Sequence, residues 1–74
     1  MQVLHSPRDF GSILRERRHA LGYTQAALAA LCGTGTRFIS DLENGKGTIE
    51  FGKSLVVAQA LGIDIVARIR GERN

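Results

Sequence analysis

Residues 25–44 constrain the fold of this 74-residue chain more than any other stretch, because two short helical patterns meet there at a glycine. Both patterns carry an inner apolar face, formed by Leu28, Ala29 and Leu31 in the first and by Ile39 and Leu42 in the second. Gly33 lies between them, where a sharp turn favours a residue that tolerates positive φ. The segment therefore predicts two short helices joined by a tight turn.

This arrangement is the layout of a helix-turn-helix, whose second helix can lie in the major groove of DNA. The small side chain of Ala29 matters here, because a larger one would push the two helices apart at their closest approach. The first helix is capped by Thr24 and ends before Gly33, and the second opens at Thr34 or Gly35 and stops at residues 43–45.

Two further helices flank this unit. Ser6, Pro7 and Asp9 favour a helix start by capping, by preset φ and by the helix dipole, so the first helix is predicted from Pro7 to Leu21. Thr48 is expected to cap the last helix, which Gly62 ends. Its inner face is predicted to consist of Ile49, Phe51, Leu55, Ala58 and Leu61.

The hydrophobic period changes to two over residues 63–70. Ile63, Ile65, Ala67 and Ile69 alternate with Asp64, Val66, Arg68 and Arg70, which predicts a β-strand. A single strand has no partner in its own chain, so we expect an antiparallel two-stranded ribbon with a second copy. The alternative is a frayed tail or an extension of the last helix. Residues 71–74 are polar and are expected to be a disordered tail.

Length and composition fit this interpretation. Seventy-four residues form one domain, 1–74, with a marginal core. Cys32 is the single cysteine, which rules out an internal disulfide and favours a reduced, cytoplasmic protein; with His5 and His19 it forms no metal-ligand spacing. Oligomerisation is therefore the expected stabiliser. The net charge of +3 fits nucleic acid only weakly, and no apolar run or leader indicates a membrane or secreted protein.

The motif Leu-Gly-Tyr-Thr-Gln-Ala-Ala-Leu-Ala over residues 21–29, then Gly33, then Arg-Phe-Ile-Ser-Asp-Leu-Glu-Asn-Gly-Lys over 37–46 resembles Cro/C1-type (XRE) helix-turn-helix proteins. The likeness covers residues 6–62 and is greatest to HipB-type antitoxins of toxin-antitoxin systems. It implies a mainly α fold: a four- to five-helix lambda-repressor-like domain whose one C-terminal strand pairs across a homodimer.

The same resemblance implies a dimeric transcriptional repressor. It would bind an inverted-repeat operator in double-stranded DNA, repress its own operon and bind a HipA-type kinase toxin. The alternative is a stand-alone XRE-family or phage-type regulator without a toxin partner.

In the resembling family the exposed start of the second helix of the motif reads bases. The matching positions here are Gly35, Thr36, Arg37, Ser40 and Asp41. Arg37 is the strongest candidate, because a guanidinium matches the two acceptors of guanine. The alternatives are a solvated surface charge or a phosphate contact. Phe38 is expected to pack in the core or an interface rather than to wedge between bases.

Phosphate contacts are implied at two further places. Thr24 and Gln25 start the first helix of the motif, where free N–H groups favour an anion, although Thr24 as a plain cap is equally compatible. Asn44, Gly45 and Lys46 form the loop after the second helix, where a plain turn is the alternative. Lys53 and Arg15 are secondary candidates.

Arg18 and Glu43 match a family ion pair that ties the first helix to the end of the third. We expect its role to be structural. Catalysis is not expected, because Cys32 falls at an inner position and neither histidine has a nucleophile or orienting carboxylate at motif spacing. The chain is therefore predicted not to be an enzyme and to need no cofactor.

Overall fold

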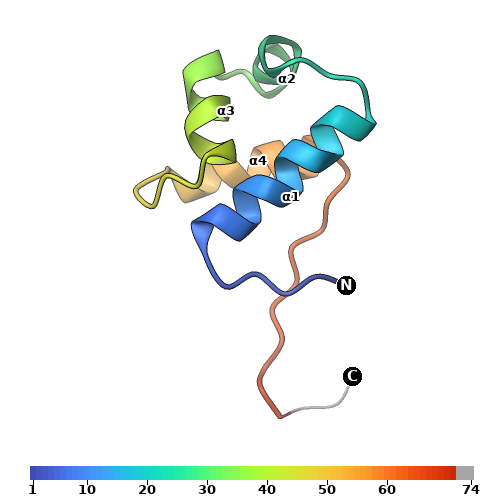
Figure 1. The fold of residues 1–74 in the computed structure, drawn as a ribbon, viewed down its shortest axis with the longest axis vertical. Helices are drawn as coiled ribbons and strands as arrows, with labels where there is room; N and C mark the ends of the chain where they lie inside the picture. Colours follow the sequence, from blue (N-terminus) through green and yellow to red (C-terminus); the bar gives the residue numbers. More distant parts are fainter. Residues whose placement is uncertain (72–74) are drawn as a thin grey trace.

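The computed structural model describes residues 1–71 and places four helices in that part of the chain (Figure 1). The helices are α1 (Pro7–Ala20), α2 (Gln25–Cys32), α3 (Thr36–Glu43) and α4 (Phe51–Ala60). The predicted fold class is confirmed as a mainly α helix-turn-helix architecture. No β-strand is present among residues 1–71, so the strand component of the prediction is not observed.

Side-chain caps start α1 and α2 where the sequence predicts. Ser6 Oγ accepts a hydrogen bond from Asp9 N at 3.1 Å, and the Asp9 carboxylate accepts from His5 N at 2.9 Å. These two bonds satisfy N–H groups that no helical carbonyl reaches. Thr24 Oγ1 accepts from Ala27 N at 3.0 Å and caps α2 in the same way. Local sequence therefore determines both helix starts.

The cap predicted for α4 is wrong. Thr48 lies in the preceding turn, and Glu50 is the N-cap residue. Its carboxylate accepts hydrogen bonds from Gly52 N at 3.0 Å and from Lys53 N at 2.8 Å. A carboxylate reaches two free N–H groups and places negative charge at the positive end of the helix dipole, whereas a hydroxyl carries no charge.

One apolar cluster joins all four helices. Its buried members are Leu14, Leu28, Ala29, Ile39, Leu42, Val57, Ala58 and Leu61. Phe10, Phe38, Ile49 and Ile63 are partly buried and pack against it. The packing of Phe38 against the core agrees with the expectation for that residue.

Two residues predicted to face inward are exposed. Leu31 in α2 is 58% exposed, because the inner face of α2 is centred between Leu28 and Ala29, where Cys32 rather than Leu31 lies. Phe51 is 64% exposed because it is the first residue of α4 and projects beyond the packed turns. The apolar pattern of the sequence thus assigned one residue too many to the buried face of each helix.

A glycine lies where α1 and α3 approach each other most closely. A Cβ atom built on Gly11 would lie 2.6 Å from the carbonyl oxygen of Glu43 and would also collide with that of Leu42. Real side chains do not tolerate such distances to backbone atoms. Gly11 therefore permits α1 to lie directly against the last turn of α3.

Residues 63–71 leave the helices and run away from them in an extended path (Figure 1). Ile63 still packs against the core, and its N–H donates to Ala58 O at 2.9 Å. From residue 64 to residue 70, no main-chain hydrogen bond joins the segment to the rest of the described chain. A strand needs a paired edge, which one chain does not supply. Apart from Gly71, the predicted tail 71–74 lies outside the described residues.

Replacing Gly11 by alanine is expected to destabilise the protein. The new methyl group must displace the main chain at the end of α3, and overpacking of this kind costs about 1–3 kcal/mol. Urea-induced unfolding followed by circular dichroism measures the change in unfolding free energy.

Gly47→Ala is the matched control, because a Cβ there meets no atom within 4 Å and φ is not positive. We expect its stability to change by less than about 0.5 kcal/mol. Equal effects of the two substitutions would contradict the close approach of α1 and α3.

Candidate nucleic-acid interface

The turn between α2 and α3 is built on Gly33. This residue has φ +68° and ψ +34°, a left-handed conformation that strains any residue with a Cβ. The N–H groups of Gly33 and Thr34 donate to Ala30 O at 3.3 Å and to Ala29 O at 2.9 Å, which closes the end of α2. The chain then extends at Gly35, the N-cap of α3. The turn therefore sets the angle between the two helices.

The first turns of α3 present polar groups to solvent. Gly35, Thr36 and Arg37 are exposed, and the side chain of Arg37 is 91% accessible. Ser40 and Asp41 follow one turn later and are half-buried. The opposite side of α3 carries Ile39 and Leu42 in the core. The five predicted base-reading residues thus belong to the outer part of one short helix and its cap.

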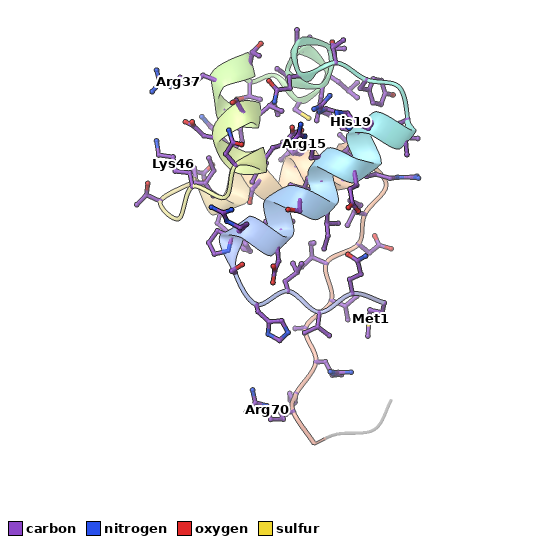
Figure 2. All side chains as sticks on the ribbon, in the orientation of Figure 1. Met1, Arg15, His19, Arg37, Lys46 and Arg70 are labelled. Carbon is purple, nitrogen blue, oxygen red and sulfur yellow. The ribbon has the colours of Figure 1, made fainter. Side chains whose placement is uncertain are left out.

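The loop after α3 lies beside this exposed face. Gly45 has φ +79°, and the N–H groups of Gly45 and Lys46 donate to Leu42 O at 3.1 Å and to Asp41 O at 3.0 Å. A Cβ on Gly45 would lie 2.7 Å from Arg8 Cα, so the loop rests against the start of α1. Asn44 Nδ2 donates to Ser40 Oγ at 3.4 Å. Figure 2 shows Arg37 and Lys46 projecting outward from the same side of the molecule.

A single carboxylate lies between these two cations. Asp41 Oδ2 is 3.9 Å from Arg37 Nε and 3.5 Å from Lys46 Nζ. The surface that contains α3 and its loop therefore combines two exposed positive charges with one negative charge. Such exposed pairs break easily, because water competes for both partners.

The side chain of Gln25 has a partner within the protein. Its side chain turns inward and its Nε2 donates to Glu43 Oε1 at 3.1 Å, while Thr24 Oγ1 caps the helix. Helical geometry accounts for this, because Gln25 lies one turn before Leu28 and Ala29 on the inner face of α2. What remains available for an anion at this end of α2 is the main chain at its first turn.

Arg18 and Glu43 form a buried ion pair between α1 and α3. Arg18 Nε is 2.6 Å from Glu43 Oε2, a second guanidinium nitrogen donates to Oε1 at 3.0 Å, and a third donates to Tyr23 O at 2.9 Å. The carboxylate thus accepts three hydrogen bonds when Gln25 is included. This two-point geometry fixes both direction and distance.

The pair shifts the acid–base equilibrium of both partners. Burial alone raises the pKa of Glu43, but the hydrogen bonds from Arg18 and Gln25 and the charges of Arg18 and Arg15 outweigh it, so the net pKa lies below the ordinary value. The hydrogen bond from Glu43 raises the pKa of Arg18 despite the opposing effect of burial. Both groups are therefore charged at neutral pH.

Sequence reasoning missed two contacts that support this region. Arg17 Nε donates to Leu61 O at 2.9 Å and so closes the C-terminal end of α4 from α1. Lys53 Nζ lies 5.8 Å from the centre of the Phe38 ring, a cation–π contact between α4 and α3. The 44-residue separation of the first pair left no local signal in the sequence.

The described residues contain no cluster of three or more His, Cys, Asp or Glu side chains that could hold a metal ion. Cys32 is partly buried, and this burial raises the pKa of its thiol, which disfavours the reactive thiolate. None of the helices formed by residues 1–71 is long and apolar enough to span a lipid bilayer.

Comparison with known proteins places this geometry in a family. The helix-turn-helix family profile matches residues 14–67, which include α2, its glycine turn and α3. The chain belongs to the Cro/C1-type (XRE) helix-turn-helix family. It is 43% identical over 70 residues to an uncharacterised HTH-type transcriptional regulator, y4mF, of Sinorhizobium fredii (strain NBRC 101917 / NGR234). The aligned region covers 95% of this chain and 92% of that protein.

Solved structures with the same fold include HipB. A HipA-HipB-O2-O3 complex matches with a TM-score of 0.86 and 23% identity, over 95% of this chain and 99% of that one. A HipB-O4 20mer complex gives a TM-score of 0.85 and 23% identity, with the same coverage of both chains. At this identity the likeness establishes the fold alone. The family match and the 43% identical relative, not this likeness, identify a DNA-binding transcription regulator rather than an enzyme.

Replacing Glu43 by alanine is expected to destabilise the domain by about 3–5 kcal/mol at neutral pH, because the buried Arg18 then lacks its partner. Acid has a related effect on the wild type. Glu43 binds a proton more readily in the unfolded chain than in the folded one. The stability that the ionised Glu43 carboxylate provides is therefore complete above the unfolded pKa of about 4.3 and is lost as pH falls through the lower folded pKa.

Thermal unfolding between pH 3 and pH 7 measures both effects, and DNA binding by Glu43→Ala should weaken with stability. Glu16→Ala removes an exposed carboxylate from α1 and serves as control. Unchanged thermal stability of Glu43→Ala at pH 7 would show that the pair has no structural role.

Proposed function

We propose that this protein is a dimeric, sequence-specific repressor that reads an inverted-repeat operator through α3. The observation that carries the proposal is the exposed start of α3, where Arg37 projects into solvent beside Lys46. Residues 1–74 would form one DNA-binding domain that acts in the cytoplasm. A two-fold dimer would place its two α3 helices about 34–36 Å apart, one turn of the duplex.

Within this proposal Arg37 donates two hydrogen bonds to guanine in the major groove. Gly35, Thr36 and Ser40 contact neighbouring base edges. Gly35 has no side chain and faces open space, so its main chain can approach the DNA closely. Asp41 lies on the same surface.

Phosphate contacts fall on either side of α3. The free main-chain N–H groups at the start of α2, next to Thr24 and Gln25, suit a phosphate on one strand. Lys46, with the main chain of Asn44 and Gly45, suits a phosphate beyond the other end of α3. Such contacts set the register of the protein on DNA but carry no sequence information.

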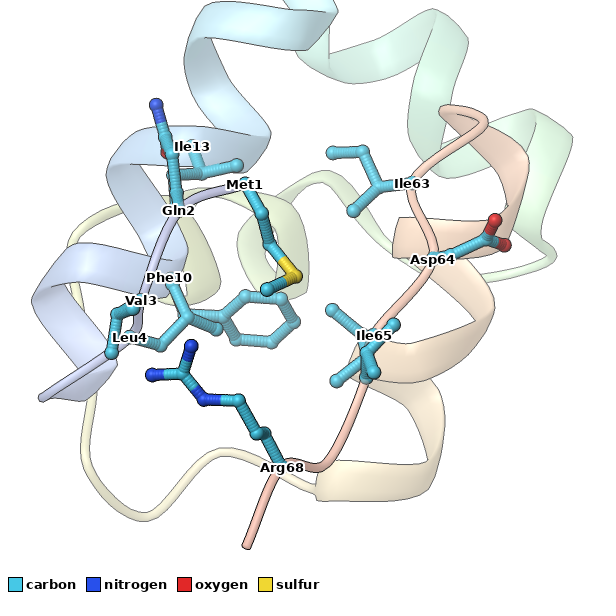
Figure 3. Close-up of a pocket in the computed structure, with 11 residues that line it drawn as sticks. Met1, Gln2, Val3, Leu4, Phe10, Ile13, Ile63, Asp64, Ile65 and Arg68 are labelled. Carbon is cyan, nitrogen blue, oxygen red and sulfur yellow. The ribbon is translucent and has the colours of Figure 1, made fainter. Parts of the chain in front are cut away.

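Residues 63–70 supply the proposed dimer contact. Ile65 and Ile69 are 44% and 68% exposed, although they are apolar. Ile63 and Ile65 border an apolar groove with Met1, Leu4, Phe10 and Ile13, and Figure 3 shows these side chains around a common space. Pairing this segment with its copy would satisfy the free main-chain groups and cover the groove. The segment leaves the helices at the end opposite α2 and α3, so pairing leaves α3 accessible (Figure 1).

A HipA-type kinase toxin is the proposed protein partner, and the operon would then be of the HipBA type. The support is the fold shared with HipB over nearly the whole chain, including HipB in complex with HipA. Co-purification with the product of a neighbouring kinase-like gene tests this partner. A gene neighbourhood without such a kinase, and a protein that binds its own promoter alone, would contradict it.

Replacing Arg37 by alanine is expected to remove sequence discrimination. Loss of a bidentate guanine contact costs about 1–3 kcal/mol, which is roughly 5-fold to 150-fold in affinity for the operator. Gel shifts at fixed salt, with DNA from upstream of the gene and a scrambled duplex, measure the ratio of the two affinities.

Lys46→Ala is the matched comparison, because loss of a phosphate contact should weaken binding to both duplexes about equally. If wild type binds both duplexes with the same affinity, α3 does not read sequence and the proposed function is wrong.

Removing residues 65–74 is expected to convert the dimer into a monomer. This truncation keeps Ile63, which packs against the core, so the helices should remain folded. Sedimentation equilibrium gives the mass, and circular dichroism checks the helical content. A dimer that survives the truncation would place the interface on the helices instead.

A further inference from the structure

Asp41 adds a negative charge to a surface that is proposed to bind negatively charged DNA. Its Oδ2 atom lies 3.9 Å from Arg37 Nε and 3.5 Å from Lys46 Nζ, so one oxygen faces the cations from both α3 and its loop. The Lys46 N–H also donates to Asp41 O at 3.0 Å, which holds the loop beside the helix. The Asp41 carboxylate therefore lies between Arg37, the proposed base reader, and Lys46, the proposed phosphate ligand.

The Asp41 carboxylate sets much of the net charge of the surface formed by residues 36–46. Residues 36–46 contain Arg37, Asp41, Glu43 and Lys46 as charged groups. Glu43 is buried and paired with Arg18, which leaves two exposed cations and one carboxylate, a net charge of +1. Replacing Asp41 by a neutral residue would double the positive charge that this surface offers to DNA.

We propose that Asp41 is a specificity-determining residue that competes with DNA phosphates for Arg37 and yields it most readily to a base with two acceptors. The inference rests on the proposed function of α3. On arbitrary sequence, Asp41 competes with phosphates for Arg37 and so weakens any phosphate contact that Arg37 makes. On the operator, guanine replaces the carboxylate with a bidentate partner. The carboxylate thus lowers affinity for competing DNA, a use of unfavourable charge to gain specificity.

The geometry suits such a release. Arg37 and Asp41 are one helical turn apart on an exposed face, and the side chain of Arg37 is 91% accessible. At 3.9 Å, the Arg37 contact is longer than a good hydrogen bond, so Asp41 weakens other contacts of Arg37 without locking the side chain, and guanine, with two acceptors, competes for it best. Lys46 Nζ lies 3.5 Å from the same oxygen and gives the carboxylate a second positive neighbour.

The test compares wild type with Asp41→Asn, which preserves shape and removes the charge. The probes are a duplex enriched by wild type from a random pool and a scrambled duplex of the same composition. Dissociation constants are measured for both at several salt concentrations, with helical content checked by circular dichroism. Glu16→Gln on α1 is the control, because it removes an exposed carboxylate away from α3.

We expect Asp41→Asn to bind the scrambled duplex roughly eightfold more tightly at about 0.1 M salt, with a salt slope steeper by about 0.9, as for one added phosphate contact. Affinity for the enriched duplex should change less, so the ratio of the two affinities falls. In an Arg37→Ala background, Asp41→Asn should no longer tighten binding to the scrambled duplex. Glu16→Gln should leave the ratio unchanged.

Three results would overturn the inference. Loss of affinity for the enriched duplex alone would make Asp41 a direct acceptor for a base such as cytosine. An equal gain on both duplexes, or a gain that persists in the Arg37→Ala background, would mean general repulsion of DNA. If wild type enriches no sequence, the proposed function fails and the inference fails with it; an enriched site with an unchanged ratio overturns the inference alone.

Discussion

The carboxylate of Glu43 is the point on which the arrangement of three helices depends. It accepts hydrogen bonds from Arg18 of α1 and from Gln25 of α2, and it belongs to the last turn of α3. Both charges of the ion pair are buried, so separating them would leave an uncompensated charge inside the protein. Gly11 complements this contact, because it lets α1 lie directly against the main chain at the same end of α3.

Most of the helical framework was predictable from local chemistry. Ser6 and Thr24 accept hydrogen bonds from main-chain N–H groups three residues later, and Gly33 takes the left-handed conformation that ends α2. These signals act within a few residues, so a sequence displays them directly. The pairing of Arg18 with Glu43 was expected from family resemblance, since 25 residues separate the two and no spacing rule connects them.

What sequence reasoning missed depends on long-range packing or on a second molecule. Leu31 and Phe51 have apolar side chains, but the positions of neighbouring helices leave them exposed. Thr48 was expected as the cap of α4 because threonine is a favoured N-cap residue and glutamate is not, yet the Glu50 carboxylate accepts hydrogen bonds from two main-chain N–H groups and caps the helix. Strand pairing of residues 63–70 requires an edge that a single chain does not contain.

The glycines that bound α3 have an evolutionary consequence. Gly33 and Gly45 both adopt left-handed conformations, so the main chain alone closes the turns before and after the helix. The exposed side chains of α3 take no part in those closures or in the apolar core. If α3 reads DNA as proposed, mutations at Thr36 and Arg37 change the preferred sequence with little loss of folding stability. Duplicated copies of such a gene can diverge in the promoters they control while retaining one scaffold.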